Sequence, residues 1–269
     1  MRPGRSDIAA PEFPHGTRWL RGTPRPMAAL AAQGPVLVHF FDFAQLNSVR
    51  SLPYVGEWQR RYPGLAVVGV QSPRFAFGAD AEVVERGLER LGVGFAVLLD
   101  PGHELWSDYG CGGWPSLFLW GRGGVLRWYH FGEGDYEGTE DAIGEELRLL
   151  DRGAEPPPAM APLRATDAAG ARVMPPTPEL FPGGEGTPWE AGEGGEIALD
   201  YEAGGAFATV EGEGELAVEL DGEAAATVRV DGAGLYELGS HPRHERHSLR
   251  LVPAPGLRVW SISFAPGVP

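Results

Sequence analysis

The sequence predicts an α/β domain followed by an antiparallel all-β sandwich, and three observations lead to this prediction. Between residues 35 and 150, short apolar runs alternate with segments of helical periodicity, as in layered folds with a partly parallel sheet. Residues 154–178 are rich in Pro and Ala and interrupt this pattern. Beyond them, apolar and polar residues alternate between Gly-rich turns, which is typical of a β-sandwich.

Individual elements follow from the same periodicities. In the first domain we expect strands at residues 36–41, 65–70, 95–99, 116–120 and 125–131, and helices at 46–62, 81–91 and 139–150. Thr139 is the expected N-cap of the last helix, because Glu140 and Asp141 follow it in the first turn. In the second domain we expect strands at 194–202, 206–212, 215–221, 224–230, 248–252 and 258–264. Asp221-Gly222 and Asp231-Gly232 predict hairpin turns.

The predicted domain boundaries divide the chain into four parts. Residues 1–30 form a loosely structured lead-in, 31–153 the α/β domain, 154–178 a linker and 179–269 the β-sandwich. The linker contains Pro156-Pro157-Pro158, so we expect it to be stiff.

Composition excludes several classes of function. The net charge of −15 disfavours binding to nucleic acid or to an anionic membrane surface. No apolar segment is long enough to span a bilayer, and the N-terminal residues lack the apolar core of a secretory signal, so the expected location is the cytoplasm. The single cysteine, Cys111, excludes an intramolecular disulfide and any multi-cysteine metal site, and we expect no cofactor.

Four segments of the first domain, in order along the chain, carry a resemblance to a known family. They are Asn47 with Arg50-Ser51-Leu52-Pro53-Tyr54, Gly69-Val70 and Ser72-Pro73 with Phe75-Ala76-Phe77, Tyr109-Gly110 with Trp114-Pro115, and Phe131-Gly132-Glu133-Gly134 with Tyr136 and Thr139-Glu140. Through them, residues 30–150 resemble the thioredoxin-like family found at the C-terminus of DipZ, within the TlpA and peroxiredoxin-like group. The resemblance implies a thioredoxin fold with a cis-proline at Pro115.

The second domain resembles the carbohydrate-binding-module-like β-sandwich that follows in the same family. Val230-Asp231-Gly232, Leu235-Tyr236-Glu237-Leu238 and His247-Ser248-Leu249 carry this resemblance. It implies a carbohydrate-binding protein as one alternative function, with a glycan stacked on exposed aromatic rings. The candidate rings are Trp189, Tyr201, Tyr236 and Trp260, and each of them can equally belong to the core.

The chain departs from the family at the site of its chemistry. In the family pattern the turn before the proline-containing helix reads Cys-x-x-Cys, whereas this chain has Gln45-Leu46-Asn47-Ser48 with Pro53 at the expected offset. Neither Gln45 nor Ser48 can supply the thiolate that attacks a disulfide. His39 occupies the position of a buried acid that assists proton transfer in many thioredoxins. We therefore expect a non-catalytic binding or scaffolding protein.

The expected binding surface is the groove that the fold retains. Its predicted lining consists of Gln45, Leu46, Asn47, Ser48, Trp114, Pro115, Glu133 and Tyr136. Thioredoxin-like folds hold extended peptides beside the cis-proline by backbone hydrogen bonds, which need no sulfur. The predicted partner is a protein or peptide segment, or a small acidic ligand at the helix N-terminus.

Cys111 supports an enzymatic alternative. It lies four residues before Pro115, on the loop expected to face the Gln45 turn. A thiol there could serve a peroxidase or thiol-disulfide oxidoreductase, although no His or Cys neighbours it in sequence to lower its pKa. The other interpretation is a small apolar residue beneath the loop.

Other clusters allow a functional and a structural interpretation. His39 with Ser48 suggests a hydrolase, or a hydrogen-bonded core histidine. The three histidines of residues 240–247 suggest a metal site, or a solvated loop before a strand; they are His241, His244 and His247. Glu211, Glu213 and Glu215 suggest calcium, or a solubilising edge. The glycines of residues 121–124 lie between two expected strands and predict a hairpin turn.

Overall fold

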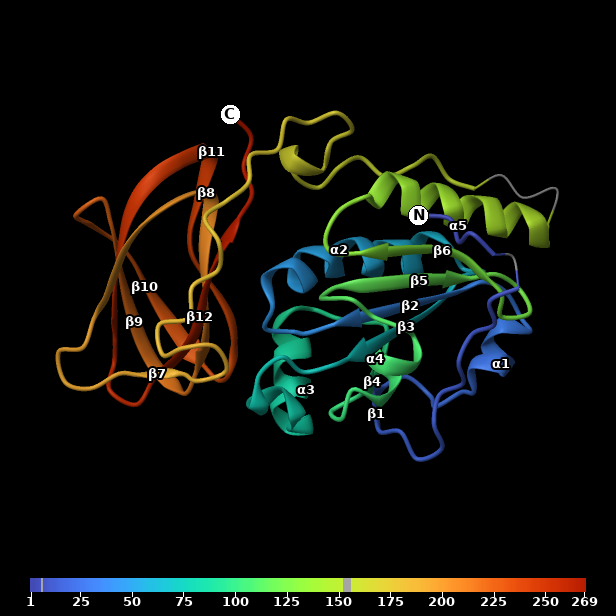
Figure 1. Cartoon of the computed structure of the whole chain (residues 1–269), viewed down its shortest axis with the longest axis horizontal. Helices are drawn as coiled ribbons and strands as arrows, with labels where there is room; N and C mark the ends of the chain where they lie inside the picture. The colour runs from blue at the N-terminus through green and yellow to red at the C-terminus, as the bar shows by residue number, and fades with distance from the viewer. Residues whose placement is uncertain (6, 152–155) are drawn as a thin grey trace. The chain divides into compact units, whose positions relative to one another are not determined.

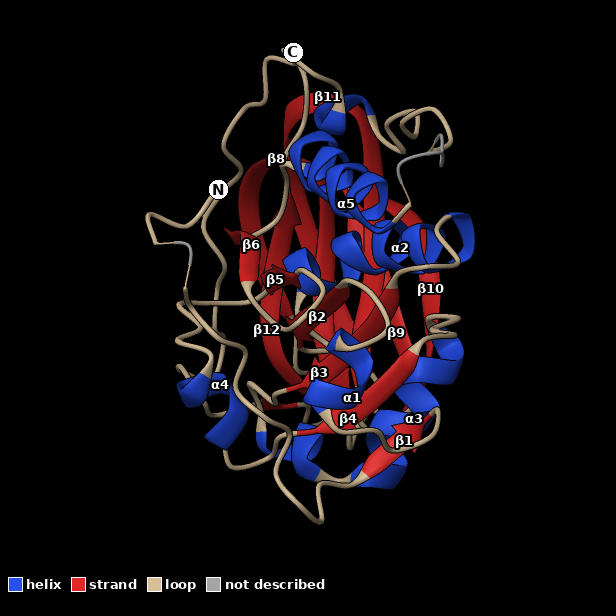
Figure 2. Cartoon of the chain, turned by 90° about the vertical axis from the view of Figure 1, so that its right-hand side faces the viewer, coloured by secondary structure: helices blue, strands red, loops and turns tan. Residues whose placement is uncertain are grey.

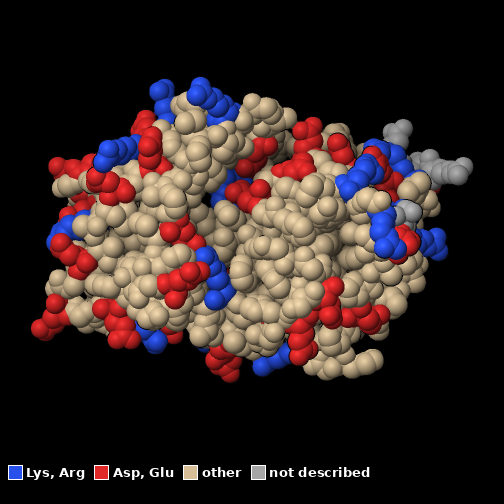
Figure 3. Space-filling model, viewed as in Figure 1, with Lys and Arg blue, Asp and Glu red and all other residues tan. Residues whose placement is uncertain are grey.

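The computed structural model describes residues 1–5, 7–151 and 156–269, in two compact units, Met1–Ala161 and Pro162–Pro269 (Figure 1). We describe each unit by itself. The predicted boundary between residues 153 and 154 lies outside the described residues. Acidic side chains are spread over the visible face of both units, interspersed with basic ones, and the described residues form no large basic patch on that face (Figure 3).

The first unit is built on a mixed sheet with strand order β1-β4-β3-β2-β5-β6. Its strands are β1 (Trp19–Arg21), β2 (Val36–Phe41), β3 (Ala66–Gln71), β4 (Ala96–Leu99), β5 (Ser116–Trp120) and β6 (Leu126–Phe131). β2 pairs in parallel with β3, and β3 with β4, whereas β5 and β6 continue the sheet antiparallel. β2 is buried along its whole length, as expected of an apolar strand at the centre of a sheet covered on both faces.

Helices cover both faces of this sheet (Figures 1 and 2). They are α1 (Met27–Ala31), α2 (Leu46–Arg61), α3 (Ala81–Arg90), α4 (Glu104–Asp108) and α5 (Tyr136–Leu150), with a 3₁₀ turn η1 (Ala76–Ala79). α2 and α5 lie side by side, where Tyr54 stacks on Tyr136 at 3.6 Å between ring centroids. α1 and α4 pack on the opposite face, where Leu30 and Leu105 join Phe40 in one buried cluster. The predicted strands and the first two predicted helices of this domain are confirmed to within a residue or two at their ends.

The N-terminal residues are packed onto the sheet, and the expectation of a loose lead-in was wrong. β1 pairs antiparallel with β4, and Phe13 is buried. The carboxylate of Glu12 accepts hydrogen bonds from the first N–H groups of α1. Ile8 accepts a backbone hydrogen bond of 2.9 Å from Leu126 in β6. The reason is that β4 and β6 would otherwise leave unpaired backbone groups at the two edges of the sheet.

The last helix begins at Tyr136, three residues earlier than predicted. Its N-cap is Asp135, with φ 48°, so the prediction of Thr139 as the cap was wrong. The Thr139 hydroxyl instead donates a hydrogen bond of 2.9 Å to the carbonyl of Asp135. Glu140, expected in the first turn of the helix, lies further along it; it is buried and accepts a hydrogen bond of 2.7 Å from the hydroxyl of Tyr62. These polar residues therefore belong to the interior of the helix.

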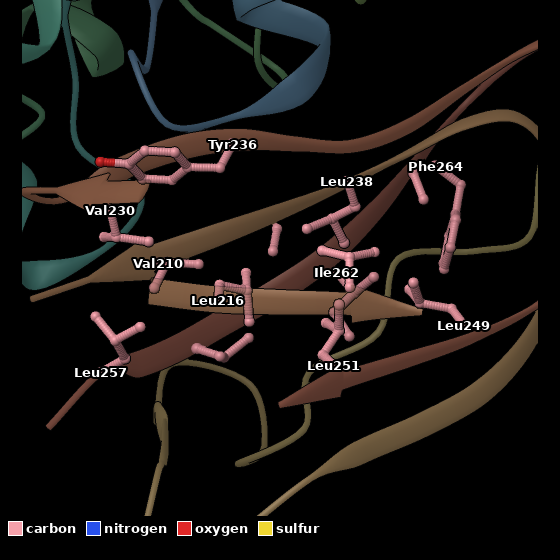
Figure 4. Close-up of a cluster of buried hydrophobic side chains, with 14 of the residues drawn as sticks. Val210, Leu216, Val230, Tyr236, Leu238, Leu249, Leu251, Leu257, Ile262 and Phe264 are labelled. Atoms are coloured by element: carbon pink, nitrogen blue, oxygen red, sulfur yellow. The ribbon is translucent and has the colours of Figure 1, made fainter. Parts of the chain in front are cut away.

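The second unit is an all-antiparallel six-stranded sheet with strand order β10-β9-β11-β8-β12-β7, folded into a β-sandwich. Its strands are β7 (Trp189–Glu190), β8 (Ile197–Glu211), β9 (Glu213–Leu220), β10 (Glu223–Asp231), β11 (Gly234–Pro253) and β12 (Arg258–Ala265); a 3₁₀ turn, η2 (Ala165–Asp167), precedes them. Apolar side chains including Leu216, Leu249 and Ile262 fill its core (Figure 4).

Two strands of this unit are longer than the sequence predicted. The expected strands 194–202 and 206–212 are one strand, β8, which continues through Gly204 and Gly205. A Cβ atom at Gly204 would lie 2.6 Å from the carbonyl oxygen of Pro266, so only glycine fits there. β11 likewise continues through residues 241–244, which form a bulge between Ser240 and Glu245. The Asp221-Gly222 hairpin turn is confirmed, with φ 54° and 83°.

In the part of the chain that the structure describes, no helix combines the length and the apolar character needed to cross a bilayer.

Candidate functional site

The Gln45–Ser48 turn lies where β2 ends and α2 begins, as predicted. Gln45 is the N-cap of α2, and its side-chain oxygen accepts 2.7 Å from the backbone N–H of Ser48. Ser48 is fully buried, and its Oγ accepts 3.2 Å from the N–H of Asp42. Leu46 is also buried, so these two residues do not line an open groove as expected. Gln45 and Asn47 are the partly exposed members of the turn.

The buried side chain of Asp42 holds this turn in place by hydrogen bonds. Its fully buried carboxylate accepts a hydrogen bond of 2.7 Å from the N–H of Ala44 and one of 2.5 Å from the N–H of Arg74. Burial raises the pKa of Asp42, and the hydrogen bonds from Arg74 and Ala44 oppose that rise. The turn is thus held to the loop after β3 by one buried side chain, which the sequence analysis did not single out.

His39 is a core histidine. It is fully buried in β2, and its Nε2 lies 3.0 Å from Oγ of Ser51 on α2. Burial lowers the pKa of His39 to about 3, which exceeds the opposing effect of the Ser116 backbone. Its side-chain partner is Ser51 and not Ser48, so the His39–Ser48 hydrolase hypothesis has no support in the geometry.

The Trp114–Pro115 peptide bond is cis, as the resemblance implies. The Trp114 indole donates 2.8 Å to the carbonyl of Ser72, and the carbonyl of Pro115 accepts 2.8 Å from the N–H of Gly132. Within the described residues, no backbone hydrogen bond involves the N–H or C=O of Trp114. Trp114 is partly exposed, whereas Pro115 is buried. The loop therefore presents main-chain groups of Trp114 at a rigidly held position.

Glu133 and Tyr136 join α2 to the turn after β6. Glu133 Oε1 lies 2.8 Å from Nε of Arg50, with 12% and 11% of the two side chains exposed. The hydroxyl of Tyr136 donates 3.0 Å to the same carboxylate oxygen. These predicted site residues are brought together, but Glu133 serves an internal ion pair and Tyr136 is buried.

Cys111 is a partly buried thiol. It packs against the buried cluster that contains Phe40 and Phe118. Burial raises the pKa of Cys111 to about 12; a hydrogen bond with Ser116 opposes this rise, and the charge of Asp100 adds to it. The thiol therefore stays protonated at neutral pH, which argues against the nucleophile that a peroxidase needs.

The three histidines of residues 240–247 lie in β11, so the expectation of a solvated loop was wrong. His241 Nε2 lies 2.6 Å from the Tyr201 hydroxyl, and its ring stacks on His247 at 3.8 Å. His247 Nδ1 lies 2.7 Å from the carboxylate of Asp221, and His244 Nε2 is 3.9 Å from Glu202. Among the described residues, no three His, Cys, Asp or Glu side chains are arranged to hold a metal, and this also applies to Glu211, Glu213 and Glu215.

The aromatic candidates for a glycan are mostly core residues. Tyr201, Tyr236 and Trp260 are at most 8% exposed, and Trp189 packs against the same core. The Trp260 indole donates 3.0 Å to Glu211. The geometry therefore gives no exposed aromatic pair among these four residues.

A pair of tryptophans beside the cis-proline was missed. The Trp106 and Trp114 rings lie 4.4 Å apart with an interplanar angle of 35°, and both are partly exposed. Asp100 accepts hydrogen bonds from the N–H groups of Leu105 and Trp106 and from the hydroxyl of Ser72. An Asp directly after a buried strand, before a short helix that contains Leu105 and Trp106, was the sequence signal that could have pointed to this arrangement.

The topology of the first unit, its paired helices and its cis-proline before β5 define a thioredoxin-fold protein with an appended β-sandwich. No family model matches the chain. Protein DipZ of Mycobacterium bovis is 27% identical over 300 aligned residues, covering 95% of this chain and 42% of that protein. DipZ of Mycobacterium tuberculosis gives the same values. The chain therefore has a thioredoxin fold and is similar to part of DipZ, and it spans less than half the length of these relatives.

Other similarities are more limited. NHL repeat-containing protein 2 of Bos taurus is 28% identical over 187 residues, covering 66% of this chain and 24% of that protein. A solved structure described as a thiol:disulfide interchange protein DsbE from Chlorobium tepidum is 24% identical and has a TM-score of 0.46; it covers 53% of this chain and 98% of its own. A thiol-disulfide isomerase from Corynebacterium glutamicum is 21% identical, with a TM-score of 0.46, and covers 51% and 96% of the two chains.

Proposed function

We propose that the first unit is a non-catalytic binding module, in which Gln45-Leu46-Asn47-Ser48 stands in place of a redox dithiol. The observation that carries this proposal is the use of Gln45 as the helix N-cap through its side-chain oxygen. The side chain at the position of a nucleophilic thiol thus holds the helix in place. The high pKa of Cys111, caused by burial, adds support because it leaves no reactive thiol on the neighbouring loop.

The proposed ligand is an extended protein or peptide segment lying beside Pro115. Support comes from Trp114, whose main-chain N–H and C=O have no backbone partner among the described residues. An extended chain alongside it would pair with these groups, as in strand addition. Asn47 and the amide of Gln45 would supply side-chain hydrogen bonds on the other side of the ligand.

A small acidic ligand is the other proposed occupant of the same groove. α2 has sixteen residues; the N–H of Ser48 is taken by the side chain of Gln45, which leaves the N–H groups of Leu46 and Asn47 at the helix N-terminus for a ligand. A carboxylate placed there would not need the main chain of Trp114. An extended peptide should therefore shift the NMR signals of the Trp114 main chain, whereas a small acidic ligand should shift only those of the α2 N-terminus.

The test is an NMR titration of the full chain with extended peptides and, separately, with a small dicarboxylate. Peptide binding is expected to shift the backbone amides of Trp114 and Asn47 and the Trp114 indole. Asn47→Ala should weaken binding, whereas Gln59→Ala, on the same helix away from the turn, should not. An insulin-reduction assay should show no activity for the unmodified chain or for either of these two variants. The proposal fails if neither probe shifts these signals.

A further inference from the structure

The partly exposed Trp106–Trp114 pair lies immediately beside the proposed peptide groove. The two indole rings are 4.4 Å apart, and His103 flanks them, with ring centroids 5.9 and 6.0 Å away. Trp106 packs on one side against the buried cluster that contains Phe40, with 6.1 Å between the ring centroids, and both tryptophans stay partly exposed. The tryptophan cluster is defined here as His103, Trp106 and Trp114.

The cluster is held rigidly by buried polar contacts. The Asp100 carboxylate, 4% exposed, accepts hydrogen bonds of 3.1 and 2.9 Å from the N–H groups of Leu105 and Trp106. It also accepts 3.1 Å from the hydroxyl of Ser72, whose carbonyl receives the Trp114 indole at 2.8 Å. The Trp114 ring is therefore fixed through Ser72, the backbone of Trp106 is fixed through Asp100, and the Trp106 ring packs edge-on against Phe40. Less side-chain entropy is then lost on binding.

The charge of the surrounding segment is one-sided. Residues 99–121 contain Asp100, Glu104 and Asp108 and no Lys or Arg. Glu104 and Asp108 are exposed on α4, the helix that carries Trp106. Arg74, on the loop after Ser72, lies over the ring of Phe75 at 5.4 Å. Arg18 lines a pocket together with Asp100 and Glu104 and offsets part of this negative charge. A cation approaching the cluster thus meets the two indole rings and the exposed carboxylates of Glu104 and Asp108.

We propose that this cluster binds a Lys or Arg side chain of the peptide held in the groove, so that the partner is a basic extended segment. This inference rests on the proposed peptide-binding function and specifies which peptide side chains the site prefers. The main chain of the peptide pairs with Trp114, and the basic side chain reaches the Trp106 ring. Attraction between the cation and the two indoles supplies selectivity over an apolar side chain of equal length.

The experiment compares short acetylated and amidated peptides that differ only in the central residue: Lys, Arg, norleucine, Gln or Glu. Calorimetry on the full chain should give the Lys and Arg peptides about fivefold tighter binding than norleucine or Gln, and the Glu peptide the weakest. Added salt should reduce the difference. Trp106→Leu should remove the preference for Lys over norleucine, whereas Trp19→Leu, in β1, should keep it.

A second variant allows the same test if Trp106→Leu does not fold. Glu104→Gln with Asp108→Asn changes only exposed side chains and should weaken the Lys peptide about twofold to threefold, leaving norleucine unchanged. The matched control, Glu137→Gln with Asp141→Asn on α5, should change neither. Equal binding of all five peptides would overturn the inference while leaving the groove as a peptide site. Failure of every peptide to bind would overturn both this inference and the proposed peptide function.

Discussion

Arg50 Nε lies 2.8 Å from Glu133 Oε1, and this ion pair fastens the start of α2 to the turn between β6 and α5. Both side chains are almost nine-tenths buried, and the Tyr136 hydroxyl donates to the same carboxylate oxygen. Tyr136 in turn stacks on Tyr54 of α2 at 3.6 Å. These contacts together link α2 to the turn after β6, and their contribution to the free energy of unfolding can be measured.

Glu133→Gln is expected to destabilise the first unit by about 3 kcal/mol, because it leaves the Arg50 charge buried without this carboxylate. Tyr136→Phe, which removes only one hydroxyl, should cost about 1 kcal/mol. Urea unfolding followed by tryptophan fluorescence would measure both. A loss below about 0.5 kcal/mol for Glu133→Gln would mean that the pair behaves like an exposed surface pair.

Cys111 should be slow to react with alkylating agents at neutral pH. Burial raises its pKa to about 12, so that only about one thiol in ten thousand is ionised near pH 8. Iodoacetamide labelling followed by mass spectrometry should be much slower than for free cysteine, and faster as the pH approaches 12. Rapid labelling at pH 7 would contradict this description of the thiol and revive the peroxidase alternative.

Gln45→Cys with Ser48→Cys should create a working redox pair on the existing scaffold. Residue 45 is partly exposed and residue 48 fully buried, which would give one accessible and one shielded thiol. The double variant is expected to form an intramolecular disulfide and to catalyse insulin reduction by dithiothreitol. Gln45→Cys alone should form only mixed disulfides. An inactive, correctly folded double variant would show that the scaffold differs from a redox one in more than its sulfur.

His39 should make the protein less stable in acid. Its folded-state pKa is lowered to about 3, whereas the unfolded chain has the ordinary value near 6.5. Between these values the unfolded state binds a proton that the folded state does not, so stability falls as pH drops below 6.5, by up to about 1.4 kcal/mol per pH unit. His39→Gln should remove this part of the slope. Unfolding curves of both proteins at several pH values would test it, and parallel slopes would contradict it.

Much of the first unit was predictable because its elements are local. The apolar run of residues 36–41 and the helical periodicity from Leu46 are visible in the sequence, and both elements formed as expected. The N-terminal residues could not be placed, because their partners, such as Leu126 for Ile8, are more than a hundred residues away. Long-range pairing of this kind leaves no periodic signal in the sequence.

The candidate site was predictable in position but not in detail. The sequence placed Gln45, Asn47 and Trp114 correctly at the helix start and the cis-proline loop. It could not show that Ser48 turns inward to accept from Asp42, or that Trp106 meets Trp114, because both contacts depend on tertiary packing. The prediction of a loop at the three histidines was wrong for a related reason. Pro242 suggested a turn, but a bulge in β11 accommodates it.

The most direct test of the central claim is an NMR titration of Cys111→Ser, a chain without any thiol, with a basic extended peptide. We expect saturable shifts of the Trp114 and Asn47 amides, the same peptide affinity as for the unmodified chain, and no insulin reduction by either protein. Binding that disappears in Cys111→Ser, or shifts confined to residues away from Gln45 and Trp114, would contradict it.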